Sequence, residues 1–250
     1  MKDWIFAFFM AWGMFLAIPC PFPRWRESAR GKMLTCLPLT GVILGALWAL
    51  AGWLLSLLSV PDPLSALILA VFPWLATGFI HLDGFMDVCD AVLSRRDLET
   101  RQKILKDSHC GAFAVISMVL LGLAQWSVCF SFPSCGTAQL LPLAAIPVAG
   151  RAAAALAVSH LRPMRTSQYA GQTHPPLGHT LFLCLLLLAA IIAPLMCSGF
   201  SGFAPLAAAL VYALSVRFGF RQLDGMSGDI SGFALTLGEL AGLAVLFFLR

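Results

Sequence analysis

Residues 78–90 read Gly-Phe-Ile-His-Leu-Asp-Gly-Phe-Met-Asp-Val-Cys-Asp and end a long apolar run with a histidine and three aspartates. Asp83, Asp87 and Asp90 are spaced i, i+4 and i+7, so a helix would place them on one face. At 5 Å and an effective dielectric near 20, two such carboxylates repel by roughly 3 kcal/mol. The pattern therefore predicts a shared cation, and all-oxygen ligands favour a hard ion such as Mg²⁺. The alternative is a solvated helix face whose acids complement the helix dipole.

The composition around this stretch is that of a membrane protein. The chain has 250 residues, of which 60% are hydrophobic and only 11% charged, whereas soluble domains carry about 25% charged residues. We therefore expect an all-α, polytopic integral membrane helical bundle, with residues 1–250 forming one multi-pass catalytic domain in the lipid bilayer. The net charge of +4 is too small for a nucleic-acid binder, so no nucleic-acid partner is expected.

Apolar runs long enough to cross a bilayer predict seven to eight transmembrane segments. Residues 4–18 form the eighth candidate, which is either a short span or a re-entrant or interfacial segment. The other seven runs are 33–59, 63–80, 110–130, 138–161, 179–197, 203–218 and 230–249.

Charge alternates from one connection to the next. The connections at 59–63, 131–137 and 197–202 contain one charged residue, Asp62, and the alternate connections hold nearly all the others. Loops rich in Lys and Arg stay in the cytoplasm. We therefore expect a protein of the cell (inner) membrane whose active site lies on the cytoplasmic side.

A second polar motif, Lys106-Asp107-Ser108, stands where the chain re-enters the membrane ahead of Gly111. A lysine there can hold phosphate, Asp107 can complete a metal site, and the amides of Ser108 or Gly111 can meet an anion at a helix N-terminus. A serine N-cap with flanking charges explains the same residues. The spacing leaves both readings open.

Arg151 lies near the middle of an apolar span, where it costs several kcal/mol unless it faces a cavity or a partner. It is expected to clamp a phosphate or to pair with the aspartates, and snorkelling is the alternative. Asp229 follows Gly228 in a glycine-rich segment at the mouth of the last span, as a site residue or as part of a turn. His81 is a candidate general base if Gly84 breaks the helix, and an interfacial histidine if it does not.

These motifs closely resemble those of the adenosylcobinamide-GDP ribazoletransferase family, also called cobalamin synthase. The most specific blocks are His81-Leu82-Asp83-Gly84-x2-Asp87-x2-Asp90 and Lys106-Asp107-Ser108-x2-Gly111. The blocks Ile18-Pro19-Cys20-Pro21, Gly150-Arg151-Ala152-Ala153 and Gly225-x-Ser227-Gly228-Asp229-x2-Gly232 match as well. This sequence departs from the family at Asp224, Ser227 and Thr236, where a glycine, a threonine and an acid are often found.

The resemblance implies a magnesium-dependent membrane transferase of the last steps of cobalamin biosynthesis. Such enzymes join adenosylcobinamide-GDP to alpha-ribazole or its 5′-phosphate and release GMP, giving adenosylcobalamin or its 5′-phosphate. Attack by the ribazole 5′ oxygen on the phosphorus bound to cobinamide is expected. The catalytic residues would be His81, Asp83, Asp87 and Asp90. The three aspartates and Asp107 would hold Mg²⁺, and the substrate-binding residues would be Lys106, Asp107, Ser108, Gly111, Arg151, Gly228 and Asp229.

Other functions remain open at this point. A CDP-alcohol phosphotransferase-like enzyme also uses spaced aspartates, but its Asp-Gly-x2-Ala-Arg motif is absent. A secondary cation transporter would place carboxylates at the midplane and show internal repeats, whereas these acids gather at one surface. A noncatalytic anchor for a cobalamin-assembly complex would not need four aspartates. A homo-oligomer, or association with other cobalamin-assembly enzymes, is also left open.

Overall fold

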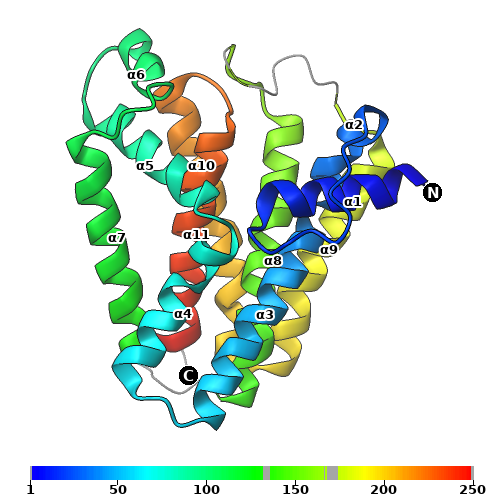
Figure 1. Ribbon diagram of the computed structural model, residues 1–250, viewed down its shortest axis with the longest axis vertical. Coiled ribbons are helices and arrows are strands. Elements are labelled where there is room, and N and C mark those ends of the chain that lie inside the picture. Colours follow the sequence, from blue (N-terminus) through cyan, green and yellow to red (C-terminus); the bar gives the residue numbers. More distant parts are fainter. Residues whose placement is uncertain (1, 132–135, 166, 168–173, 249–250) are drawn as a thin grey trace.

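The apolar runs fold into long helices in the computed structural model, which describes residues 2–131, 136–165, 167 and 174–248. The expected all-α membrane bundle is confirmed (Figure 1). In chain order the elements are α1 (Lys2–Phe15), η1 (Glu27–Ala29), α2 (Arg30–Met33), η2 (Leu34–Cys36), α3 (Leu37–Leu57), α4 (Asp62–Ala76), α5 (Ile80–Leu93), α6 (Leu98–Ile104), α7 (Ala112–Phe130), α8 (Thr137–His160), α9 (Leu177–Cys197), η3 (Gly199–Phe203), α10 (Ala204–Leu223) and α11 (Gly228–Phe248).

Within the described residues, six helices are long and apolar enough to cross a membrane, and the bent pair α4–α5 brings the number to seven. The eighth candidate, residues 4–18, forms α1, which has 14 residues and so measures about 21 Å. That is less than the roughly 30 Å of a hydrocarbon core. Figure 1 shows α1 lying across the direction of α8 and α9, as an interfacial or re-entrant segment would.

The span expected at 63–80 is wrong beyond Ala76, because the chain turns there by 91° into α5. The helix α4 ends in a Schellman motif, in which Phe79 N–H donates to the Trp74 carbonyl at 2.9 Å and Gly78 N–H to the Leu75 carbonyl at 3.1 Å. Gly78 has φ +60 and Phe79 has φ +63. A glycine in the left-handed region thus stops α4 and lets α5 leave in a new direction.

The interior of the bundle is formed mainly by α8 and α11, which are largely buried, while α7 and α9 present most of their surface outward. Around this centre, α3 and α10 pack on α8, and α5 packs on both α11 and α7. Trp48, Arg151, Tyr212 and Phe247 are among the largest fully buried side chains. The helix α11 therefore packs against α8 in the buried core and against α5 as well.

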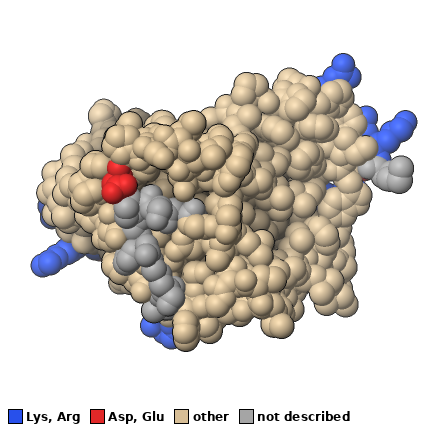
Figure 2. Space-filling model, turned by 90° about the horizontal axis from the view of Figure 1, so that it is seen from below, with Lys and Arg blue, Asp and Glu red and all other residues tan. Residues whose placement is uncertain are grey.

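The two ends of the bundle differ in charge. Figure 1 places the α3–α4 and α9–α10 connections at the lower end, and the α5–α6 segment at the upper end. Seen from below, the face carries one small acidic patch, and the basic side chains in view project only at its edges (Figure 2). This agrees with the alternation in the sequence, and the upper end is called the charged end below.

Candidate active site

Two glycines allow α5 and α11 to approach closely at the charged end. A Cβ added to Gly84 would lie 2.8 Å from the Asp229 backbone, and one added to Gly232 would lie 2.9 Å from the His81 carbonyl oxygen. Any larger residue at either position would push the helices apart. This contact places the start of α11, with Asp229, directly against the acidic face of α5.

Four carboxylates gather at this contact. Asp87 interacts electrostatically with Asp83, Asp229 and Asp90, and all of these interactions are repulsive. Asp83 is exposed, whereas Asp87, Asp90 and Asp229 are half-buried. None of the ion pairs in the described parts of the chain involves any of the four. The group therefore concentrates negative charge without a protein cation to balance it.

The loop that carries Asp229 is held in place by its own hydrogen bonds. Ser227 Oγ accepts from Ile230 N–H at 3.2 Å and donates to Asp229 Oδ2 at 3.3 Å, so it caps α11 and orients the carboxylate. Upstream, Met226 N–H donates to the Arg162 carbonyl and Met164 N–H donates to the Met226 carbonyl, both at 2.9 Å. The Ser227 hydroxyl therefore holds both the start of α11 and the Asp229 carboxylate in place.

Asp90 has a different role from its two neighbours on α5. Its Oδ2 accepts from Gly111 N–H at 2.7 Å and its Oδ1 accepts from Ala114 N–H at 3.3 Å. A carboxylate is favoured at these free amides, where the helix dipole is positive. The anion that the sequence predicted at the Gly111 amide is therefore, in this structure, the side chain of Asp90.

The carboxylates suit Mg²⁺ by their chemistry but do not form a complete cage. No group of three His, Cys, Asp or Glu side chains within the described residues is arranged to hold a metal ion. Magnesium usually takes only one or two protein carboxylates and completes its shell with water and substrate phosphates. Any one or two of Asp83, Asp87 and Asp229 would suffice for that mode, because each supplies hard oxygen ligands and the group carries excess negative charge.

Lys106, Asp107 and Ser108 lie in the exposed segment between α6 and α7. Asp107 Oδ1 accepts from His109 Nδ1 at 2.6 Å and from His109 N–H at 3.0 Å. The hydrogen bond from the His109 ring lowers the pKa of Asp107 and raises that of His109. Asp107 is not among the groups that act on Asp87, so its predicted metal role has no support from this arrangement and stays a prediction.

His81 is buried on the side of α5 away from the aspartates. Its ring stacks on Phe15 with centroids 6.2 Å apart, and its Nε2 has no hydrogen-bond partner. The helix α5 runs without interruption through Gly84, so the break that would turn His81 toward the carboxylates does not occur. The geometry favours a packing role for His81, and its predicted role as a base stays untested.

Arg151 pairs with a different acid from the ones expected. Its Nη1 donates to Glu239 Oε1 at 2.8 Å and to the Pro147 carbonyl at 3.4 Å, and the side chain is fully buried. The expected pairing with the aspartates of α5 is wrong, because Glu239 on α11 provides the nearer partner. Phosphate binding by Arg151 remains a prediction.

A cavity of about 480 Å³ opens beside Asp83. Its walls come from the end of α1 and from the α4–α5 bend, and they include Leu16, Ala17, Thr77 and Phe79. Ala17 N–H donates to the Ala76 carbonyl at 2.8 Å, which ties the two segments together. The sequence reading did not place this N-terminal segment at the site, although its match to the family's opening block was a signal.

Comparison with known proteins agrees with these motifs. A family model described as cobalamin-5-phosphate synthase matches residues 7–247. A protein of Clostridium botulinum (strain Alaska E43 / Type E3), named adenosylcobinamide-GDP ribazoletransferase, is 35% identical over 246 residues, 97% of each chain. Proteins with the same name from Clostridium perfringens (strain 13 / Type A) and Pseudomonas putida (strain W619) are each 36% identical. They cover 98% and 87% of this chain, and 99% and 87% of their own lengths.

No solved structure matches the chain. The family model spans nearly all of the described helices, including α5, the start of α7 and the glycine-rich entry to α11. The resemblance found in the sequence motifs is thereby confirmed. The chain belongs to the cobalamin-5-phosphate synthase family, whose relatives cited above are adenosylcobinamide-GDP ribazoletransferases.

Proposed function

We propose that this chain is a magnesium-dependent transferase that joins adenosylcobinamide-GDP to alpha-ribazole or its 5′-phosphate and releases GMP. The observation that carries the proposal is the group of unbalanced carboxylates, Asp83, Asp87 and Asp229, at the contact of α5 with α11. A diphosphate is itself an anion, so it approaches such a group only with a cation between them. Family membership supports the identity of both substrates.

Asp83, Asp87 and Asp229 would hold Mg²⁺, which when bound neutralises charge on the diphosphate and on the leaving group. Lys106 is exposed at the start of the segment before α7 and forms no ion pair with another described residue. It is available to bind a phosphate oxygen of the substrate. Asp90 holds the start of α7 by accepting hydrogen bonds from the Gly111 and Ala114 amides. It thereby also positions the end of the segment between α6 and α7 that carries Lys106.

The reaction exchanges one phosphorus–oxygen bond for another. A ribazole hydroxyl oxygen attacks the phosphorus that bears cobinamide, the bond to the bridging oxygen breaks, and GMP leaves with that oxygen. The hydroxyl proton passes to a carboxylate of the cluster or to water. Asp90 is less suited to accept it than Asp83 or Asp87, since both of its oxygens already accept amide hydrogen bonds.

The expected attack by the ribazole 5′ oxygen does not fit the family's description as a cobalamin-5-phosphate synthase. When the acceptor carries a 5′-phosphate that remains in the product, the 5′ oxygen is already esterified. The attacking group must then be another hydroxyl of the ribose. The same assignment serves the unphosphorylated acceptor, so one geometry accounts for both.

We further propose that the charged end of the bundle faces the cytoplasm of a cell (inner) membrane, as loops rich in Lys and Arg do. Two exposed native cysteines test this, because Cys110 lies at the charged end and Cys197 at the other. Two variants are made, each of which keeps Cys110 or Cys197 and has every other cysteine replaced. Both are treated in intact spheroplasts with a membrane-impermeant thiol reagent. Cys197 should react at once and Cys110 only after permeabilisation, and the reverse order would overturn the orientation.

The function is tested by incubating the purified protein with adenosylcobinamide-GDP, alpha-ribazole and Mg²⁺ and measuring GMP. Wild type should form GMP only when both substrates and the metal are present. Asp83→Asn should reduce turnover at least about 100-fold, the scale of losing one major electrostatic contact in a transition state. Asp62→Asn, at the opposite end, is the matched control and should keep normal turnover. Normal activity in Asp83→Asn would remove the proposed metal role.

A further inference from the structure

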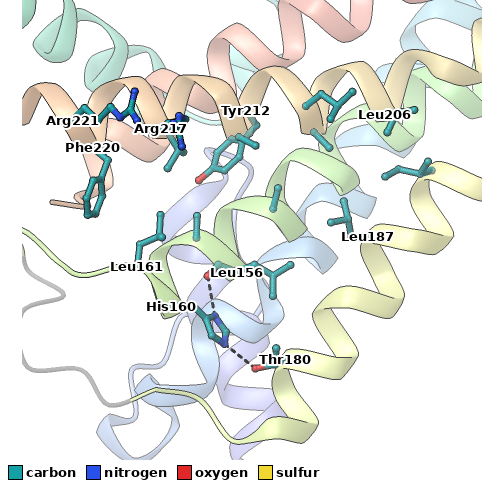
Figure 3. Close-up of a pocket in the computed structure, with 17 residues that line it drawn as sticks. Leu156, His160, Leu161, Thr180, Leu187, Leu206, Tyr212, Arg217, Phe220 and Arg221 are labelled. Carbon is teal, nitrogen blue, oxygen red and sulfur yellow. Dashed lines mark hydrogen bonds between the residues drawn. The ribbon is translucent and has the colours of Figure 1, made fainter.

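A cavity of about 870 Å³ lies away from the carboxylates, in a groove between α8, α9 and α10. Figure 3 shows its shape: α8 forms the floor, and side chains of α9 and α10 form the two walls. Most of the lining is aliphatic or alanine, including Ala153, Ala157, Leu187, Leu206 and Ala213. All three helices are apolar enough to cross a membrane, so the groove opens toward lipid.

One end of the groove is basic. Arg217 and Arg221 stand one turn apart on α10 at the charged end, with Phe220 beside them (Figure 3). Both arginines are exposed, and neither takes part in an ion pair within the described residues. No acidic residue lines the groove. The pair therefore presents two guanidinium groups, the side chain best suited to bind phosphate.

At this end the floor, formed by α8, and the wall formed by α9 also carry polar side chains, and a hydrogen bond joins them. His160 Nδ1 contacts the Leu156 carbonyl at 2.9 Å, and its Nε2 contacts Thr180 Oγ1 at 3.0 Å (Figure 3). This bond joins the end of α8 to the start of α9. The polar lining thus gathers where the groove meets the charged end of the bundle. Farther along, the lining is apolar apart from Tyr212, whose hydroxyl lies 3.1 Å from Ser231 Oγ.

The length of the groove fits one lipid leaflet. Leu206 and Arg221 both line it, and at 1.5 Å per residue they are about 22 Å apart along α10. One leaflet contributes roughly 15 Å of hydrocarbon depth. An acyl chain that starts near the arginines would therefore lie within the groove over its whole length.

We propose that an anionic phospholipid occupies this groove, with its phosphate on Arg217 and Arg221 and one acyl chain along α8 and α10. The arrangement selects for negative headgroups, because no carboxylate among the described residues forms an ion pair with Arg217 or Arg221. This site is separate from the proposed transferase site and does not depend on the reaction assigned to it.

The proposal is tested by reconstituting the protein in nanodiscs of phosphatidylcholine with one fifth phosphatidylglycerol and identifying retained lipid by native mass spectrometry. Wild type should retain phosphatidylglycerol in preference to phosphatidylcholine. Since each basic residue near an anionic lipid surface contributes about fivefold, Arg217→Gln with Arg221→Gln should lower that retention about thirtyfold. Arg95→Gln with Arg96→Gln removes the same charge from an exposed loop at the same end and should leave retention unchanged.

A second pair of variants tests the acyl chain separately. Ala213→Phe places an aromatic ring in the groove, while Leu214→Phe alters the adjacent exposed residue, which does not line it. The first should lower phosphatidylglycerol retention several-fold and the second should not. Equal retention of both lipids by wild type, or insensitivity to the arginine pair or to Ala213→Phe, would overturn the proposal. The proposal would also be overturned if a second copy of the chain occupied the groove, which the mass spectra would show as a dimer that these variants lose.

Discussion

The helix α11 carries two acids in opposite circumstances. Glu239, in its buried middle, has its own cation, since Arg151 donates to it at 2.8 Å. Asp229, at its start and about 15 Å away along the helix, faces Asp83 and Asp87 and pairs with no described cation. A buried acid with a partner serves the fold, because removing either group would leave a charge in a low-dielectric interior. Acids left without a partner are available for a ligand.

The largest effect on stability is expected when the ion pair of Arg151 with Glu239 is broken. Glu239→Leu leaves Arg151 buried and uncompensated, which should lower the free energy of unfolding by about 3–5 kcal/mol. Arg151→Met combined with Glu239→Leu removes both charges and should recover most of that loss. Thermal unfolding in detergent measures all three proteins. If Glu239→Leu alone were as stable as wild type, the pair of Glu239 with Arg151 would not stabilise the bundle.

For the acids without a partner we expect the reverse: substitution should reduce activity without reducing stability. Asp87→Asn removes a carboxylate from three like charges, so stability should stay equal or rise. GMP formation should nevertheless fall at least about 100-fold. Unfolding and turnover are measured on the same preparation. If Asp87→Asn unfolds more easily than wild type, the cluster is a structural element and the comparison with Glu239 fails.

Asp90 stands between these two cases, because backbone amides rather than a cation satisfy it. A Cβ at Gly111 would lie 2.0 Å from Asp90 Oδ2, so Gly111→Ala should displace the carboxylate and cost about 1–2 kcal/mol in the free energy of unfolding. Gly122→Ala, inside α7 with open space around it, is the control. It should be neutral or slightly stabilising, and equal behaviour of the two variants would argue against the cap.

The smallest effect is expected at an exposed pair. Glu99 Oε1 lies 2.7 Å from Lys103 Nζ on α6, and both side chains are mostly solvent-accessible. Such i, i+4 pairs contribute about 0.3–0.5 kcal/mol, so Glu99→Gln should change the unfolding temperature by little and leave GMP formation intact. A large loss of activity would mean that α6 carries part of the site.

Much of the fold could be predicted from local sequence. The long apolar runs predicted the spanning helices, since length and hydropathy are sufficient for that purpose. The i, i+4 spacing placed Asp83 and Asp87 on one face of a real helix. The apolar run does not predict the bend after Ala76, because hydropathy does not distinguish a glycine within a span from one that ends a helix with positive φ, as Gly78 does.

The partners of the buried polar groups could not be predicted in the same way. Arg151 and Glu239 are 88 residues apart, and Asp90 and Gly111 are 21 apart. Nothing in the local pattern of either residue specifies the other, since these contacts depend on how helices cross. The sequence suggested for Gly84 only a possible helix break, and its contact with the Asp229 backbone is known only from the packed structure.

The 91° turn between α4 and α5 also bears on how a large soluble substrate could meet a membrane enzyme. Had α4 continued straight, the next two turns would have carried the acidic residues along the bundle axis. Turned aside, the same residues form a ledge beside the bundle's charged end, open to bulk water along Asp83. A hydrophilic reactant could then dock from solution without entering hydrocarbon, and only the protein would need to be embedded in lipid.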